Sequence, residues 1–339
     1  MGQYIIRRML QAIPLLILIA VLVFFLIQIS GDPTAEMAAN PRFTEADIAL
    51  ERARLGLNEP LFPTRFITWL IGDDWRERDY TGDGIIDGPG QQRGILRGDF
   101  GDSYRFKVPV VEIVSQRLPN TILLGTSAYI ITLIVSLVIG LYAALRPYTL
   151  PDNILTGASF ITFSMPIFLI ALLLVQIFAV SLGLLPVQGM CPARGECTLV
   201  ERARHMILPI VSLSLISIAG YSRYVRTSML EVINSDYIRT ARSKGLAERR
   251  VVSLHALKNA SLPLVTLIGL DVPLILAGAV VTETIFGWNG MGALFIESLN
   301  FNDSPVIVFF VLMVAVAVVA FQLLTDIAYA WLDPRVRFS

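Results

Sequence analysis

Long apolar runs constrain this chain more than any other feature of its sequence. They are long enough to cross a hydrocarbon layer of about 30 Å. The runs are Met9–Ile29, Ile122–Leu145, Ile154–Leu185, His205–Ser222, Leu262–Val281 and Val306–Ala330, of which the fourth gives the weakest signal. Because lipid offers backbone groups no hydrogen-bond partner, each run is predicted to be an α-helix. The predicted fold class is an all-α integral membrane protein with six transmembrane helices.

Composition excludes a soluble protein of this length. Of the 339 residues, 55% are hydrophobic and only 16% are charged, and the mean hydropathy is +0.66. The formal net charge is zero, so no nucleic acid is expected as a partner. Membrane lipid is expected to be a partner of the apolar runs. The first run is too long for a signal peptide and lacks a cleavage site at Ile29–Pro33, so it is predicted to be retained.

Lys and Arg predict how the spans are oriented. Arg7 and Arg8 precede the first span, Arg146 lies between the second and third, and the loop from Arg223 to Lys258 carries eight basic residues. Glu283–Asp303 carries none. Since short cytoplasmic loops are rich in Lys and Arg, both termini and the loop around residues 223–260 are predicted to be cytoplasmic.

This topology divides the chain into three parts. Residues 1–30 form a cytoplasmic tail and the first span, residues 31–117 an extracytoplasmic segment or subdomain, and residues 118–339 a transmembrane domain with the second to sixth spans. In the extracytoplasmic part, Thr44 and Asp47 predict the capped start of a helix that runs toward Leu55.

The cytoplasmic loop 223–260 is predicted to contain a short docking helix. Ser235 and Asp236 suit its N-terminal end, and Gly245 can adopt the left-handed conformation that stops it. Tyr237, Ile238 and Ala241 are predicted to share one face, which is too small to fold alone and is predicted to sit in a groove on another protein. The predicted docking residues are Tyr237, Ile238, Arg239, Thr240, Ala241, Arg242, Lys244 and Gly245.

Asp236–Gly245 together with His255–Pro263 resembles the cytoplasmic signature of ATP-binding-cassette importer permeases, above all of the dipeptide and oligopeptide branch. The wider family's Glu-Ala-Ala opening is here Arg239-Thr240-Ala241, a departure that the peptide branch shares. Further segments that look like this branch, in order along most of the chain apart from residues 68 to 94, are Gly98–Ser103, Arg117–Thr121, Glu283–Gly292, Asn302–Pro305 and Leu332–Arg337.

The resemblance implies a permease in the inner membrane of a prokaryote, importing di- and oligopeptides by alternating access. It implies a second permease subunit, usually a related but different chain, two cytoplasmic ATPases that hold ATP and Mg²⁺, and an extracytoplasmic substrate-binding protein. The docking residues would then couple the permease to an ATPase. The same branch includes machinery for nickel, glutathione or oligosaccharides, which remain alternative cargoes.

No catalytic residue is predicted, and the chain is not expected to be an enzyme. It contains no Gly-x-Ser-x-Gly elbow, no His-Glu-x-x-His helix and no phosphate-binding loop, so an ATPase must come from a partner. The alternative of a different class is an ATP-independent channel or secondary transporter, which the single internal acid and the lack of an obvious inverted repeat disfavour. A receptor or scaffold would explain the docking loop but not the other similar segments.

Asp271 is the one acid well inside a predicted span and is a candidate for the translocation path, because a lipid-exposed carboxylate is costly. Asp271 and Pro273 are predicted to break the fifth span near its middle. A buried structural hydrogen bond is the alternative role of Asp271. Asp326 is expected at the membrane interface, and Gly140 and Gly278 at helix contacts.

The segment from residue 79 to residue 87 has the spacing of a calcium loop. The candidate ligands Asp79, Thr81, Asp83 and Asp87 fall at positions one, three, five and nine. Gly90 stands where the closing acid belongs, so calcium would need a ligand from elsewhere, and a solvated turn is the alternative.

Cys191 and Cys197 are the only cysteines, and both fall in the predicted outer loop between the third and fourth spans. In an oxidising compartment they are candidates for a disulfide; free thiols or a metal pair are the alternatives.

Overall fold

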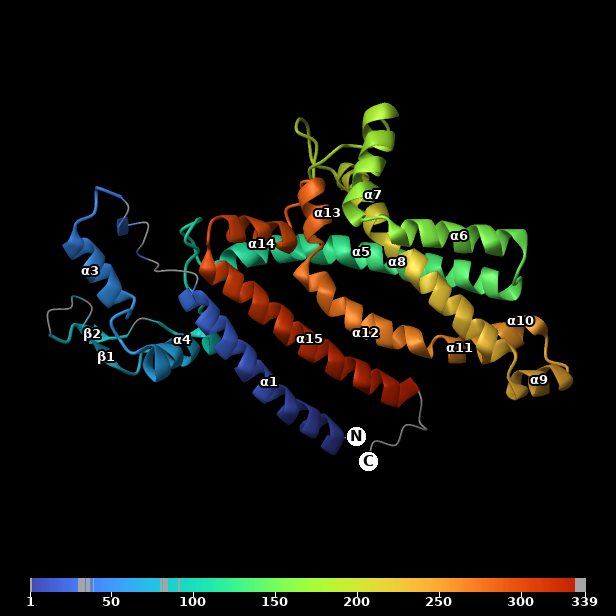
Figure 1. Ribbon diagram of the computed structural model, residues 1–339, viewed down its shortest axis with the longest axis horizontal. Coiled ribbons are helices and arrows are strands. Elements are labelled where there is room, and N and C mark those ends of the chain that lie inside the picture. The colour runs from blue at the N-terminus through green and yellow to red at the C-terminus, as the bar shows by residue number, and fades with distance from the viewer. Residues whose placement is uncertain are drawn as a thin grey trace. The chain divides into compact units, whose positions relative to one another are not determined.

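The computed structural model describes residues 2–29, 34, 37–38, 40–79, 81, 85–90 and 92–332, most of which are helical (Figure 1). The chain packs as two compact units. One consists of Met1–Arg8, Arg117–Leu294 and Ala317–Ser339, and the other of Met9–Gln116 and Phe295–Val316. The second includes most of the expected extracytoplasmic segment, and the first includes the loop 223–260 that is expected to be cytoplasmic.

Four described helices are long and apolar enough to cross a membrane: α1 (Gly2–Ile29), α5 (Val110–Leu145), α8 (Leu199–Ile233) and α15 (Ser304–Leu332). A bent pair of helices makes a fifth span if it is counted as one. The prediction of a mostly helical protein with several spans is confirmed. The fifth predicted span contains α12 (Leu262–Ala277), whose 16 residues are short for a crossing, so the count of six remains a prediction.

The third predicted span is not the single continuous helix expected over Ile154–Leu185. α6 (Leu150–Ser164) is followed by α7 (Ile167–Leu174) and the π-helical turn η3 (Val175–Ser181), with a bend of 106° between α6 and the α7–η3 segment. Met165 stands before Pro166 and is extended, with φ −86° and ψ 133°. The proline ring disfavours helical geometry in the residue before it, which explains the bend.

The predicted break at Asp271 and Pro273 is wrong, because α12 continues through both residues. A proline inside a membrane helix is tolerated where the surrounding structure satisfies the freed backbone groups. The helix ends instead at Gly278, whose φ of +80° suits glycine, and α13 (Val280–Ile285) follows. α14 (Met291–Asn300) then leads toward α15.

α8 is the central helix of the first unit, and α6 packs along it. After α8 the loop that was predicted to be cytoplasmic folds into α9 (Asp236–Ser243), α10 (Glu248–Arg250), the π-helical turn η4 (Val251–Ala256) and α11 (Leu257–Ala260). Gly140 of α5 lies directly against α8: a Cβ atom added there would meet Val225 Cβ at 2.5 Å and Ser222 O at 2.7 Å. This agrees with the helix-packing role expected for Gly140. Elsewhere in the unit, Arg8 Nε of α1 pairs with Asp326 Oδ2 of α15 at 3.2 Å.

The second unit contains short elements: α3 (Glu45–Arg54), the π-helical turn η1 (Leu61–Arg65), α4 (Phe66–Ile71) and the 3-10 turn η2 (Ile95–Arg97). Thr44 caps α3 as expected, since Asp47 N donates to Thr44 Oγ1 and Thr44 N donates to Asp47 Oδ2. α4 is attached to α1 by aromatic side chains, the Phe24 and Phe66 rings lying 5.3 Å apart.

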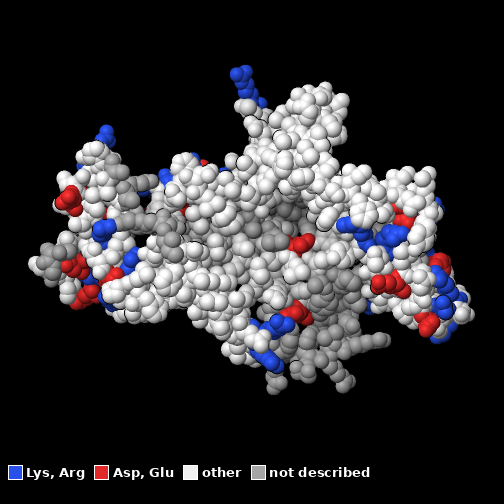
Figure 2. Space-filling view, viewed as in Figure 1, with Lys and Arg blue, Asp and Glu red and all other residues white. Residues whose placement is uncertain are grey.

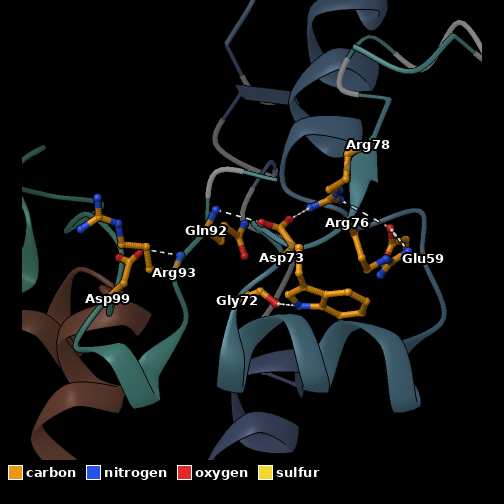
Figure 3. Close-up of polar contacts among 9 residues, drawn as sticks. Glu59, Gly72, Asp73, Arg76, Arg78, Gln92, Arg93 and Asp99 are labelled. Atoms are coloured by element: carbon orange, nitrogen blue, oxygen red, sulfur yellow. Dashed lines mark hydrogen bonds and ion pairs between the residues drawn. The ribbon is translucent and has the colours of Figure 1, made fainter. Parts of the chain in front are cut away.

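A buried polar network organises residues 68–94, the part that the family resemblance does not cover (Figure 3). The two-residue strands β1 (Glu77–Arg78) and β2 (Gly88–Pro89) pair antiparallel there. Arg78 Nη1 donates to Asp73 Oδ2 at 2.6 Å, and Gln92 N donates to Asp73 Oδ1 at 2.9 Å. Asp73 is fully buried, so these bonds replace the water that its charge has lost.

Candidate functional site

The docking helix forms where the sequence predicts it. α9 begins after Ser235 and ends at Ser243, and Gly245 follows Lys244 with a φ of +76°. Capping by the Ser235 side chain is not observed, because its hydroxyl donates to Val232 O at 2.6 Å instead of accepting from α9. The glycine conformation agrees with the expected stop of the helix.

The apolar face of α9 is already occupied within this chain. Ile238 is fully buried and Ala241 nearly so, in a cluster with Val225 and Met229 of α8 and Val251 of η4. For Ile238 and Ala241 the expectation that this face fills a groove on another protein is therefore wrong, and Tyr237, which was expected on the same face, is exposed. The returning turn η4, which the sequence pattern did not predict, supplies the groove.

The opposite face of α9 is exposed and polar, and its charged residues lie outward. Exposed residues on it are Asp236, Tyr237, Arg239, Thr240, Arg242, Ser243 and Lys244. In Figure 2, charged side chains gather in the region of α9 and α10, while the surface over the apolar helices carries few. A surface of this kind suits a polar or acidic partner more than an apolar groove.

Two side-chain contacts brace this surface. Arg242 Nη2 and Nε donate to the Glu248 carboxylate at 2.6 and 3.1 Å, which lowers the pKa of Glu248 below its ordinary value of 4.5. Asn259 Nδ2 donates to Tyr237 OH at 3.2 Å. Both contacts tie α9 to the segment that leads into α12.

Asp271 lies where α5, α8 and α12 come together. Its Oδ2 accepts a hydrogen bond from Tyr221 OH of α8, and the Tyr221 and Tyr129 hydroxyl oxygens are 3.3 Å apart. This chain of hydroxyl groups supports the alternative role that the sequence left open, a structural hydrogen bond.

Asp271 also lines a cavity of about 280 Å³ within the first unit. The described lining combines small apolar positions with hydroxyl groups and two acids, and it contains no Lys or Arg. It consists of Thr121, Leu124, Gly125, Ala128, Tyr129, Thr132, Leu213, Ser217, Asp271, Ile275, Gly278, Ala279 and Glu283. The cavity supports the translocation-path role, so both roles of Asp271 have a structural basis.

Glu283 is a residue of this site that the sequence reasoning missed. It is 1% exposed, and its carboxylate accepts from Thr121 Oγ1 at 2.9 Å and from Ala293 N at 3.0 Å. Thr121 Oγ1 accepts in turn from Met291 N at 2.7 Å. Thr121 and Glu283 lie in two segments that resemble the peptide branch, Arg117–Thr121 and Glu283–Gly292. Nothing in the sequence indicated that these two segments are in contact.

The proposed calcium ligands lie in the second unit. Thr81 Oγ1 donates to Asp79 Oδ1 at 3.2 Å and to Asp87 Oδ2 at 3.3 Å, so these three residues do come together. The fourth candidate, Asp83, lies outside the described residues. Within the described residues, no group of three or more His, Cys, Asp or Glu side chains could hold a metal ion. Calcium binding thus remains a prediction.

Cys191 and Cys197 are joined by a disulfide, with their Cα atoms 5.3 Å apart. The chain just before this loop is bonded to the residue that follows α13, since Gly189 N donates to Phe286 O at 2.7 Å. His205 is hydrogen-bonded through Nδ1 to Glu201 O at 2.8 Å.

Comparison with known proteins gives a consistent match over the whole chain. Residues 136–338 match the family described as binding-protein-dependent transport system inner membrane component, and residues 1–125 match its N-terminal counterpart. The chain is 38% identical over 340 residues to the oligopeptide transport system permease protein AppB of Bacillus subtilis (strain 168), covering 100% of both. It is 35% identical over 359 residues to the dipeptide transport system permease protein DppB of Escherichia coli (strain K12), covering 99% of both. It is 34% identical over 340 residues to the glutathione transport system permease protein GsiC of Salmonella paratyphi A, again covering 100% of both.

Proposed function

This chain belongs to the family of binding-protein-dependent transport system inner membrane components, and on that premise we propose that it is a permease subunit of an ATP-binding-cassette importer for di- and oligopeptides. The observation that carries the proposal is the full-length similarity, at 38% and 35% identity, to an oligopeptide and a dipeptide permease. The chain is thus a multi-pass inner-membrane protein.

We further propose six spans with both termini in the cytoplasm. In this proposal the fifth predicted span also crosses the membrane, formed by the 16 residues of α12 and, after the break at Gly278, by α13. The eight basic residues between Arg223 and Lys258 support a cytoplasmic position for α9.

The proposed partners are a second permease, two ATPases that bind ATP and Mg²⁺, and an external substrate-binding protein. The exposed polar face of α9 would dock against an ATPase. When ATP draws the ATPases together, α9 would move with them and displace α8, to which it is joined by the adjoining chain and through the apolar cluster that contains both Ile238 and Met229. The cavity beside Asp271 would then open alternately to the two sides.

Glutathione is the second candidate cargo, because the chain is 34% identical over its whole length to a glutathione permease. Glutathione is itself a tripeptide, so the same path chemistry serves both.

The proposal is tested by purifying the chain in mild detergent from its native membrane and identifying what accompanies it by mass spectrometry. We expect a second multi-span chain and an ATPase with a phosphate-binding loop. After reconstitution with the binding protein, uptake of dipeptides, oligopeptides and glutathione should depend on ATP. Recovery of the chain alone, together with passive uptake in proteoliposomes, would instead favour an ATP-independent channel.

A further inference from the structure

α6 and α8 are joined by an ion pair that belongs neither to the docking surface nor to the cavity. Arg226 Nε and Nη2 donate to Asp152 Oδ1 and Oδ2 at 2.7 and 2.8 Å. The Asp152 side chain is 1% exposed and that of Arg226 is 22% exposed. Two parallel charge-assisted bonds hold both distance and orientation, which a single bond would not.

The surroundings of Asp152 hold its carboxylate in place. Tyr148 N donates to Asp152 Oδ2 at 2.8 Å, and the acid lies in the first turn of α6, where the helix end is positive. The neighbouring basic group on α8, Arg223, lies over the rings of Phe160 and Phe163 of α6 at 4.8 and 5.0 Å. Arg226 is therefore the basic residue of α8 that forms the ion pair with the first turn of α6.

The position of Arg226 on α8 connects the Asp152–Arg226 ion pair to the docking helix. Val225 and Met229, its neighbours along α8, belong to the cluster that buries Ile238 and Ala241 of α9. One stretch of α8 thus contributes apolar side chains to the cluster that buries α9, and a charged side chain to the ion pair with α6. A displacement of α9 that moves this stretch would act directly on the Asp152–Arg226 pair.

We propose that Asp152 and Arg226 are a positioning pair that makes α6 follow α8 when the docking helix moves. This proposal rests on the proposed function. Its consequence is that the bent segment formed by α6 and α7, and not α8 and α12 alone, takes part in the transport cycle. An isolated buried ion pair is weak evidence for stability, because apolar residues of similar volume can replace it at little cost. Its two-point geometry is what fixes one helix to another.

The test uses the assembled importer in proteoliposomes, with Arg226→Met, Asp152→Asn and the double variant. We expect each single variant to hydrolyse ATP at close to the wild-type rate while the number of ATP molecules consumed per imported peptide rises about tenfold, within the usual range of coupling between distant sites. The double variant should be no worse than either single one, because both changes remove the same connection.

Arg226→Lys keeps the charge but loses the two-point geometry, so it should show an intermediate ratio. It also gives an answer if Arg226→Met fails to assemble. The matched control is the exposed pair at the other end of α8, where Arg204 Nη1 lies 3.2 Å from Glu201 Oε1: Glu201→Gln and Arg204→Gln should leave the ratio unchanged.

Assembled variants with the wild-type ratio of ATP to peptide would overturn the proposal. So would uptake and ATP hydrolysis that fall in proportion to the amount of assembled complex, since that is the signature of a merely structural contact. Failure of the wild-type complex itself to import peptides with ATP would be a different result, because it would reject the proposed function on which this pair depends.

Discussion

At the scale of single residues, the two acids of the cavity occupy different environments. Glu283 is enclosed by neutral donors from Thr121 and Ala293, and it holds the segments around α5, α13 and α14 together. Asp271 has one hydrogen bond of its own, from Tyr221, and borders open volume. Of the two, Asp271 is the better placed to meet a passing cargo.

Asp271→Asn removes the charge and keeps the size of the side chain. We expect peptide uptake to fall by about tenfold with assembly preserved, because a hydrogen bond to a charged group contributes about 1.5–3 kcal/mol. The control is Tyr221→Phe, which removes the hydrogen bond and keeps the carboxylate. If Tyr221→Phe reproduces the whole defect, the role of Asp271 is structural; if it retains near-normal uptake, the carboxylate itself serves the path.

The Arg242–Glu248 pair predicts a pH dependence of the docking loop. Because hydrogen bonds from Arg242 lower the pKa of Glu248, the folded loop favours the charged form. The contribution is fully present above the ordinary value of 4.5 and is lost as the pH falls through the lowered value. A nitroxide label on Ser243→Cys should therefore show constant mobility from neutral pH down to the ordinary value of 4.5, and greater mobility as the pH falls through the lowered pKa of Glu248. Adding Glu248→Gln should give the mobile spectrum already at neutral pH; an unchanged spectrum would show that the pair does not hold the loop.

At the scale of elements, the position of α9 in the chain was predicted correctly, but the prediction of what covers its apolar face was wrong. Its start, its end and its apolar face all follow from the residues Asp236–Gly245. What the pattern does not contain is η4, which returns beneath the helix and covers Ile238. The surface of α9 that is left for the proposed contact with an ATPase is consequently the charged one.

Gly245→Val tests the end of this helix. A β-branched residue is strained at a φ of +76°, so the turn into Leu246 should shift and carry the docking surface with it. We expect normal membrane insertion and ATPase binding, with uptake uncoupled from ATP hydrolysis. Gly245→Asn is the control, since asparagine tolerates the left-handed conformation and should keep most of the coupling. Normal transport by Gly245→Val would exclude the assigned role.

At the scale of the whole molecule, the open question is how often the chain crosses the membrane. The number of crossings depends on α12, which is short for a membrane span and ends at Gly278. If it crosses together with α13, then the loop before it and the helix after it must lie on opposite sides.

This prediction can be checked with Ser253→Cys and Asn300→Cys, both at exposed positions on the two sides of α12. The native cysteines are joined in a disulfide and do not compete for the reagent. A membrane-impermeant maleimide should label Asn300→Cys from outside intact cells and Ser253→Cys only after the membrane is opened. Labelling of both from the same side would remove the α12 crossing and with it the six-span topology.

Local pattern by itself determined the mostly helical membrane class, the capped start of α3, the docking helix and its glycine stop. Each of these depends on residues adjacent in the chain: apolar length, a capping residue, or a conformation that glycine adopts at little cost. The bend at Met165 also had a local cause in Pro166, although the apolar run concealed it.

Only the tertiary structure decided which distant residues meet. The contact of Thr121 with Glu283, the cavity beside Asp271, the pairing of Asp152 with Arg226 and the burial of Ile238 each join segments separated by other elements. Local pattern shows whether a residue is apolar, charged or small. It does not show which distant residue is its packing, hydrogen-bond or ion-pair partner. In a membrane protein a buried polar group without a partner is costly, and the packing of the helices selects which partner it finds.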